Sequence, residues 1–167
     1  MGNIAYREVG KSELDVIQPL WESLNAMHET CSPYFADRFK RYSFAERKRE
    51  LLDHAHGGSL LMLVARDMKQ DSDIGYCVST FLGSTGKIDS LFVDGRCRGC
   101  GIGHELMVRS LEWLNGRGAK DIVVDVVAGN ESAWNFYARY GFAPHRTCLL
   151  HRGSDGCGKS EQERTRP

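Results

Sequence analysis

The stretch Arg98-Gly99-Cys100-Gly101-Ile102-Gly103 decides how this chain folds. Residues 88–93 before it predict a strand, and residues 105–114 after it carry apolar side chains at helical spacing. A glycine loop between a strand and a helix lets an anion approach the backbone, and the helix N-terminus adds free N–H groups and partial positive charge. The stretch therefore predicts a phosphate-binding loop.

Two common nucleotide-binding loops do not fit this part of the sequence. A dinucleotide loop of the pattern G-x-G-x-x-G would need its last glycine at His104 or Leu106. The P-loop pattern G-x-x-x-x-G-K-[ST] does occur at residues 153–160, but such a loop works only between a buried strand and a helix, and residues 161–167 offer no helix. We expect this second match to be accidental, which argues against a nucleotide hydrolase.

The N-terminal part predicts one strand and two helices. Residues 4–9 have the mixed character of an edge strand, and Ser12 is suited to cap a first helix. Ser43, with Glu46 three residues later, forms a capping-box pattern that begins a second helix. Residues 34–42 between the helices form an irregular aromatic and basic loop. This loop either packs its rings on the core or forms a wall of a substrate pocket.

The pattern then changes from helices to strands. Residues 60–65 and 74–82 predict an antiparallel hairpin. Residues 122–127 are the most β-branched run, so we expect a central strand there, parallel to residues 88–93 because a helix joins the two. A short aromatic helix follows, and residues 142–150 predict a last strand.

Composition and charge narrow the class of protein. The 167 residues predict one domain over residues 1–152, followed by a glycine-rich, charged tail, residues 153–167, that we expect to be disordered. Lysine and arginine together number 22, as do aspartate and glutamate, and this balance argues against nucleic acid or an anionic membrane as a partner. Without a signal-peptide core or an apolar run long enough to span a bilayer, a cytoplasmic protein with reduced cysteines is expected.

Two motifs in the second half resemble the signatures of the GNAT superfamily of N-acetyltransferases. Arg98, Gly101 and Gly103 match that family's pyrophosphate loop, Arg-x-x-Gly-x-Gly. The family's second signature, Asn-x-x-Ala-x-x-x-Tyr-x-x-x-Gly-Phe, is matched by Asn130, Ala133, Tyr137, Gly141 and Phe142. The resemblance implies an α+β (α/β/α) fold in which a mixed central sheet of six to seven strands carries about four helices. Two central parallel strands, here residues 88–93 and 122–127, would separate and admit acetyl-coenzyme A.

The resemblance also implies an enzyme that moves the acetyl group of acetyl-coenzyme A directly to a primary amine of a small molecule, peptide or protein. The cofactor-binding residues that it implies are Leu91, Phe92, Val93, Arg98, Gly99, Cys100, Gly101, Ile102, Gly103, His104, Asn130 and Tyr137. Within this set, the Leu91 N–H would hold the developing oxyanion and Tyr137 would be the general acid. Asp89, at the same strand parity as Leu91, is the expected base, working through water, and Asp125 and Glu131 are its rivals.

The cysteines inside the loop have no place in this signature. Cys97 and Cys100 with His104 offer three ligands but no second pair at zinc-finger spacing, so no metal site is expected. Either both cysteines are small residues tolerated in a surface loop, or Cys100, at a helix N-terminus, is a reactive thiol.

A function of another class is also compatible with the resemblance. A catalytically silent module that binds coenzyme A or acetyl-coenzyme A, as a sensor or regulator, would carry the same loop. Tyr137 and the intact loop favour the enzyme. Because family members are often dimers, the resemblance allows a homodimer, whereas the identity of the amine acceptor cannot be read from the sequence.

Overall fold

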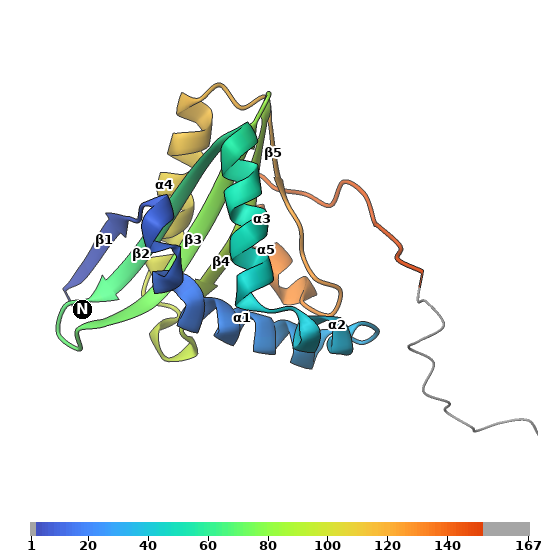
Figure 1. The fold of residues 1–167 in the computed structure, drawn as a ribbon, viewed down its shortest axis with the longest axis horizontal. Coiled ribbons are helices and arrows are strands. Elements are labelled where there is room, and N and C mark those ends of the chain that lie inside the picture. Colours follow the sequence, from blue (N-terminus) through green and yellow to red (C-terminus); the bar gives the residue numbers. More distant parts are fainter. Residues whose placement is uncertain (1–2, 152–167) are drawn as a thin grey trace, which may run out of the picture.

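The computed structural model describes residues 3–151, which form one five-stranded sheet between two layers of helices (Figure 1). The strands are β1 (Ile4–Glu8), β2 (Ser59–Asp67), β3 (Ser72–Leu82), β4 (Thr85–Val93) and β5 (Asp121–Val124). The α-helices are α1 (Gln18–Cys31), α2 (Ala36–Arg41), α3 (Phe44–Gly57), α4 (Ile102–Gly116) and α5 (Trp134–Ala138). Short 3-10 helices are η1 (Lys11–Ile17), η2 (Gly95–Cys97) and η3 (Glu131–Ala133). This architecture confirms the predicted α+β fold class.

The sheet has the strand order β1-β2-β3-β4-β5. Neighbouring strands from β1 to β4 are antiparallel, so β2 and β3 form the predicted hairpin. β4 and β5 are parallel, as expected, and α4 makes the crossover connection that a parallel pair requires. The sheet is therefore mixed, and the strands of its only parallel pair among residues 3–151 are joined through the glycine loop and α4.

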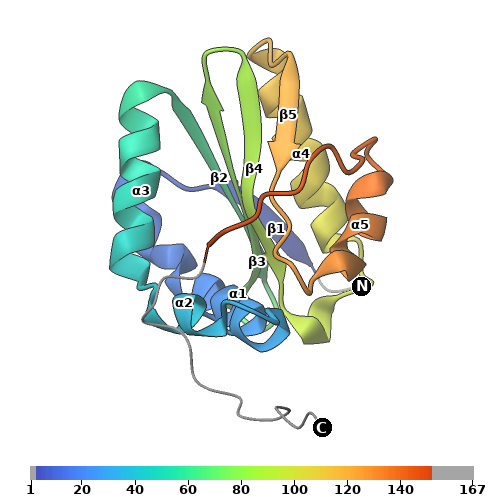
Figure 2. The ribbon, with the colours of Figure 1, turned by 90° about the vertical axis from the view of Figure 1, so that its right-hand side faces the viewer.

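Two apolar cores lie on opposite faces of the sheet because side chains alternate along each strand. On one face, Tyr76 of β3 packs with buried residues of α1 and α3, among them Leu20 and Leu51. On the other face, Cys77 of β3 packs with Leu106 of α4. Figure 2 views this arrangement with α3 on one side of the strands and α4 and α5 on the other. The helix that follows the glycine loop, α4, thus packs on a different core from α1 and α3.

The N-terminal helices are partly as predicted. The Ser43 hydroxyl accepts from the Glu46 N–H at 3.3 Å and the Glu46 carboxylate accepts from the Ser43 N–H at 2.8 Å, which confirms the capping box. The first helix begins differently, because η1 starts after Gly10, and Ser12 caps nothing there. The expected irregular loop at residues 34–42 contains the short helix α2.

The C-terminal half departs from three expectations about strands. β5 lies at the edge of the described sheet instead of its centre and ends at Val124 instead of residue 127. Residues 142–150 form no strand, so the described sheet has five strands and not six or seven. The reason is pairing, because a segment becomes a strand only beside a neighbour that completes the ladder of hydrogen bonds. The predicted tail, residues 153–167, lies outside the described residues.

One further expectation fails at Asp89, because β4 contains a bulge. Val78 of β3 pairs with Ser90, but the next residue, Ser79, pairs with Ile88, so Asp89 has no residue opposite it. A bulge turns its extra side chain to the other face. The Asp89 carboxylate therefore lies on the α3 face and not on the face of Leu91.

Candidate active site

A cavity of about 510 Å³ opens where β4 and β5 separate. The parallel ladder runs from Thr85 opposite Asp121 to Ile88 opposite Val124, and beyond this pair the strands part. Of the residues predicted for the site, Asp89, Leu91, Phe92, Val93, Arg98, Gly99, Gly101, Ile102, Gly103, His104, Asn130 and Tyr137 line the cavity. Cys100 does not line it and is exposed. The fold thus brings both sequence motifs to one cleft.

A second hollow, of about 610 Å³, lies elsewhere on the surface. It lies between α1 and α3 and is lined by Asp15, Trp21 and Lys48 among others. It includes none of the residues that the two motifs predict. The smaller cavity is therefore the candidate active site.

The glycine loop has the backbone that anion binding requires. Gly99 and Gly101 have φ angles of 79° and 81°, in the left-handed region that favours glycine. Gly101 stands directly before α4, and its carbonyl accepts the helical hydrogen bond of Glu105 at 3.0 Å. The first N–H groups of α4 have no acceptor within the helix, so they are available to a ligand in the cavity.

Arg98 joins the glycine loop to the two neighbouring elements. Its Nε donates to the Val93 carbonyl at the end of β4 at 3.2 Å. Its terminal nitrogen lies 3.8 Å from the sulfur of Met27 on α1, and its guanidinium lies 5.8 Å from the centre of the Phe92 ring. Arg98 therefore holds the loop against the strand while its positive charge stays at the cavity.

The backbone of β4 presents hydrogen-bond donors to the opening. The Asp94 N–H donates to the Ile74 carbonyl of β3 at 2.8 Å. Because successive backbone groups of a strand point to alternate sides, the N–H groups of Leu91 and Val93 point away from β3, toward the gap beyond β5. Leu91 lies past Ile88, the last residue of β4 that pairs with β5, so its N–H can meet a ligand there.

Tyr137 lies on α5 among aromatic rings at the cavity wall. Its ring centre is 5.2 Å from that of Phe136 and 5.9 Å from that of Phe142. Burial, with a smaller contribution from Cys77, raises the pKa of Tyr137 to about 12. The hydroxyl therefore stays protonated throughout the physiological range.

His104 and Asn130 line the cavity through contacts of their own. The His104 ring lies against Tyr140, with Nδ1 2.9 Å from the tyrosine hydroxyl. The Asn130 side-chain oxygen accepts from the Ser132 hydroxyl at 3.4 Å. The backbone N–H of Asn130 donates to the Val127 carbonyl at 2.9 Å. Both residues are held by neighbours along α4, α5 and the turn before η3.

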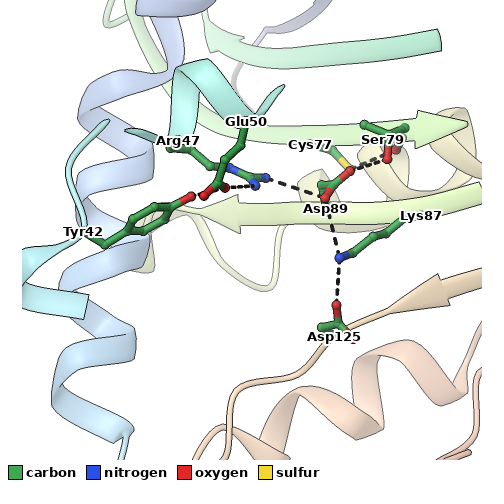
Figure 3. A network of polar contacts seen from close by, with 9 residues as sticks. Tyr42, Arg47, Glu50, Cys77, Ser79, Lys87, Asp89 and Asp125 are labelled. Carbon is green, nitrogen blue, oxygen red and sulfur yellow. Dashed lines mark hydrogen bonds and ion pairs between the residues drawn. The ribbon is translucent and has the colours of Figure 1, made fainter. Parts of the chain in front are cut away.

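Asp89 lies at the centre of the polar network in Figure 3. Its side chain is only 2% exposed and accepts from the Thr80 hydroxyl at 2.5 Å. The Arg47 guanidinium reaches it from α3 at 3.9 Å, and the Lys87 ammonium lies 3.8 Å away. Lys87 also pairs with Asp125 on the chain after β5 at 2.8 Å, which links the two strands where they part (Figure 3).

The rival carboxylates for the role of base occupy different places. Asp125 lines the cavity and its side chain is 85% exposed. Glu131 is exposed and outside the cavity lining, and its carboxylate accepts from the Gly129 N–H at 2.9 Å. This backbone hydrogen bond lowers the pKa of Glu131. The structure therefore brings Asp89 and Asp125 together at the cleft and leaves Glu131 in the turn.

The sequence prediction missed the contribution of α1. Leu24, Met27 and His28 line the cavity from this helix. Their spacing puts them on one helix face, which was visible in the sequence, but only the packing of α1 beside β4 shows that the face borders the site. His28 is thus a titratable group at the cleft that neither motif contains.

Comparisons with known proteins agree with this fold and cleft. The model of the acetyltransferase (GNAT) family matches residues 21–142. N-alpha-acetyltransferase 30 of Schizosaccharomyces pombe (strain 972) is 38% identical over 61 residues, which cover 36% of this chain and 41% of that relative. The match thus spans less than half the length of the curated relative.

Two solved structures share the fold at low sequence identity. The paia N-acetyltransferase from Thermoplasma acidophilum, in complex with coenzyme A, has a TM-score of 0.68 at 16% identity, covering 87% of this chain and 93% of that one. The ribosomal-protein-alanine N-acetyltransferase from Brucella melitensis has a TM-score of 0.64 at 16% identity, covering 91% and 100%. None of the described helices is long and apolar enough to cross a membrane. Because the family model covers most of the described residues, this chain belongs to the acetyltransferase (GNAT) family.

Proposed function

We propose that this acetyltransferase moves the acetyl group of acetyl-coenzyme A directly to a primary amine of a small molecule, peptide or protein. The observation that carries the proposal is the cavity between β4 and β5, which gathers the glycine loop, Asn130 and Tyr137 around one space. The loop backbone and Arg98 fit the pyrophosphate of the cosubstrate. Asn130 and the freed backbone of β4 fit its pantetheine arm.

The proposed reaction needs an oxyanion donor and an acid. The amine nitrogen attacks the thioester carbon, a C–N bond forms, and the carbonyl electron pair moves to oxygen, where the Leu91 N–H stabilises it. When the pair returns, the C–S bond breaks and the thiolate takes a proton from the Tyr137 hydroxyl. The tyrosinate regains a proton from the nitrogen of the new amide, so Tyr137 ends the cycle neutral.

The base proposed from the sequence, Asp89 acting through water, is in a constrained position. Asp89 lines the cavity, but its carboxylate already accepts from Thr80 and lies near the cations Arg47 and Lys87. These partners keep the carboxylate in place beside the separating strands. A water that carries a proton to it would compete with all three.

Protein and peptide α-amino groups are the first acceptors to test. The curated relative is an N-alpha-acetyltransferase by name, although the match covers 41% of it. The α1 wall of the cavity supplies apolar side chains, Leu24 and Met27, that suit an apolar group next to the amine. The exposed carboxylate of Asp125 suits the positive charge of the amine before reaction.

The experiment is a paired measurement of coenzyme A release and acceptor mass. The purified chain is incubated with acetyl-coenzyme A and a panel of peptides with different first residues, together with small diamines. Thiol release that matches the gain of one acetyl group on an acceptor supports the proposal. Tight acetyl-coenzyme A binding without thiol release over the whole panel would instead support the silent module.

A further inference from the structure

His28 of α1 lines the cleft. It shares one helix face with Leu24 and Met27, and all three residues line the cavity. Met27 contacts Arg98 of the glycine loop, which places this turn of α1 beside the end of β4. An imidazole therefore borders the space between the separated strands from outside both motifs.

The surroundings of the His28 ring hold it in place without using its nitrogens. The ring centre lies 5.4 Å from that of Phe39 on α2, at an interplanar angle of 54°. Among residues 3–151, no hydrogen bond or ion pair engages either ring nitrogen of His28. Burial lowers the pKa of His28, so the neutral imidazole, which can accept a proton, is the resting form at neutral pH.

The charged and titratable groups around this space come from every neighbouring element. Those that line the same cavity as His28 are Asp89 of β4, Asp125 after β5, Cys97 of η2, Arg98 and His104 of the loop and α4, and Tyr137 and Arg139 of α5 and its C-cap. Burial alone accounts for the shift in the pKa of His28, so none of these charges holds the imidazole in one protonation state. Burial, not an ion pair, lowers the pKa of His28.

His28 differs from Asp89 in the one respect that a base needs. The Asp89 carboxylate is bound by Thr80 and flanked by two cations, whereas the imidazole nitrogens have no partner among the described residues. A general base must reach the proton that it removes, directly or through one water. His28 lines the cavity and its ring nitrogens are free of such partners, whereas the Asp89 carboxylate is already engaged.

We infer that His28 is the general base that takes the first proton from the acceptor ammonium. One N–H bond of the ammonium breaks, its electron pair stays on nitrogen as the nucleophile, and the proton moves to the free imidazole nitrogen. After acetyl transfer, His28 releases this proton to solvent, so the reaction yields the amide, the thiol and one proton. Asp89 then serves as a positioning residue that holds the bulge of β4 against α3.

The inference rests on the proposed function and is tested by the pH dependence of kcat/KM for the best peptide acceptor. In the wild type, kcat/KM rises with pH through the lowered pKa of His28. His28→Gln should reduce kcat about a hundredfold and remove this rise, the acid limb of the pH profile. Added imidazole should restore part of the rate. His54→Gln, the same change at an exposed position of α3, should leave rate and profile unchanged.

Two further variants separate His28 from its rival. Phe39→Ala exposes the imidazole, so the acid limb should move to higher pH, toward the ordinary histidine value of about 6.5. Asp89→Asn should keep the limb even where it lowers the rate. Two results would overturn the inference but not the proposed function. In the first, His28→Gln keeps its turnover and the rise of kcat/KM with pH. In the second, only Asp89→Asn abolishes that rise. Absence of acetyl transfer by the wild type to any amine overturns the proposed function, and the inference with it.

Discussion

Lys87 on β4 and Asp125 beyond β5 form an ion pair of 2.8 Å at the point where the two strands part. The same ammonium lies 3.8 Å from Asp89, so one cation joins carboxylates from both sides of the gap. The pair stands next to Ile88 and Val124, the last residues of the parallel ladder. The network thus marks the closed end of the cleft. The charges on its two carboxylates should differ in how much they stabilise the fold.

Neutralising Asp89 should destabilise the fold far more than neutralising Asp125. The Asp89 side chain is 2% exposed and is bound by Thr80, and without its charge the Arg47 guanidinium is left without a counter-ion on that side. We expect Asp89→Asn to lower the free energy of unfolding by about 2 kcal/mol. The Asp125 side chain is 85% exposed, so Asp125→Asn should cost less than about 1 kcal/mol. Urea unfolding of both variants gives the comparison, and equal losses would contradict it.

Removing the Tyr137 hydroxyl should slow the reaction without weakening cosubstrate binding. Tyr137→Phe keeps the ring contacts with Phe136 and Phe142 but removes the proton donor, so kcat should fall about a hundredfold. The Kd for acetyl-coenzyme A, measured by calorimetry, should stay within about twofold because the ring remains. Tyr6→Phe, on β1 and outside the cavity lining, is the matched control. An unchanged kcat in Tyr137→Phe would remove it from the mechanism.

Alkaline pH should destabilise the fold through buried tyrosines. In the folded state the pKa of Tyr137 is raised from 10.0 to about 12, while the unfolded chain keeps the ordinary value. Below about pH 10 the hydroxyl is neutral in both states, and above it only the unfolded state ionises, so stability falls from about pH 10 to about pH 12. Tyr137→Phe should reduce this slope by up to about 1.4 kcal/mol per pH unit. Urea midpoints that decline equally in both proteins would show that Tyr137 is not buried as described.

Two glycines of the loop should respond differently to alanine. Gly101 has a φ of 81°, and a Cβ there would meet nothing within 4 Å, so Gly101→Ala is opposed by backbone strain of about 1 kcal/mol and not by a clash. Because the strain would be relieved by turning the loop N–H groups, acetyl-coenzyme A binding should weaken about tenfold. Gly103 lies inside α4 without a positive φ, and a Cβ there would lie 3.4 Å from the Phe136 ring. Gly103→Ala should therefore keep the loop backbone, and calorimetry that shows the larger loss for this variant would contradict the expected order.

The sequence predicted the elements whose signals are local. The Ser43 capping box, the β2–β3 hairpin and the glycine loop are read from residues within a few positions of one another, and all three are present. The bulge at Asp89 could not be predicted, because a one-residue slip depends on which residues of β3 pair with β4. For the same reason, residues 142–150 have strand-forming residues but no strand.

The sequence singled out the glycine loop and Tyr137 of the candidate site, but it did not indicate the residues of α1 that also line the cavity. The loop and Tyr137 carry spacing that a known signature shares, so the sequence alone was enough to single them out. His28 carries no such signal, since a single histidine on an amphipathic helix is ordinary until the helix packs beside a cleft. Its contact with the Phe39 ring joins α1 to α2, and such contacts between helices are absent from sequence patterns.

Acetyl transfer itself is tested by stoichiometry: coenzyme A release and acetylated product are measured in the same reaction with acetyl-coenzyme A and a peptide bearing a free α-amino group. We predict one thiol released for each acetyl group gained by the peptide amine. We also predict that Gly101→Ala loses this activity mainly through weaker acetyl-coenzyme A binding and Tyr137→Phe mainly through kcat. Acetyl-coenzyme A bound tightly in the cleft, with neither thiol nor acetylated amine formed across the peptide and diamine panel, would contradict the proposed function.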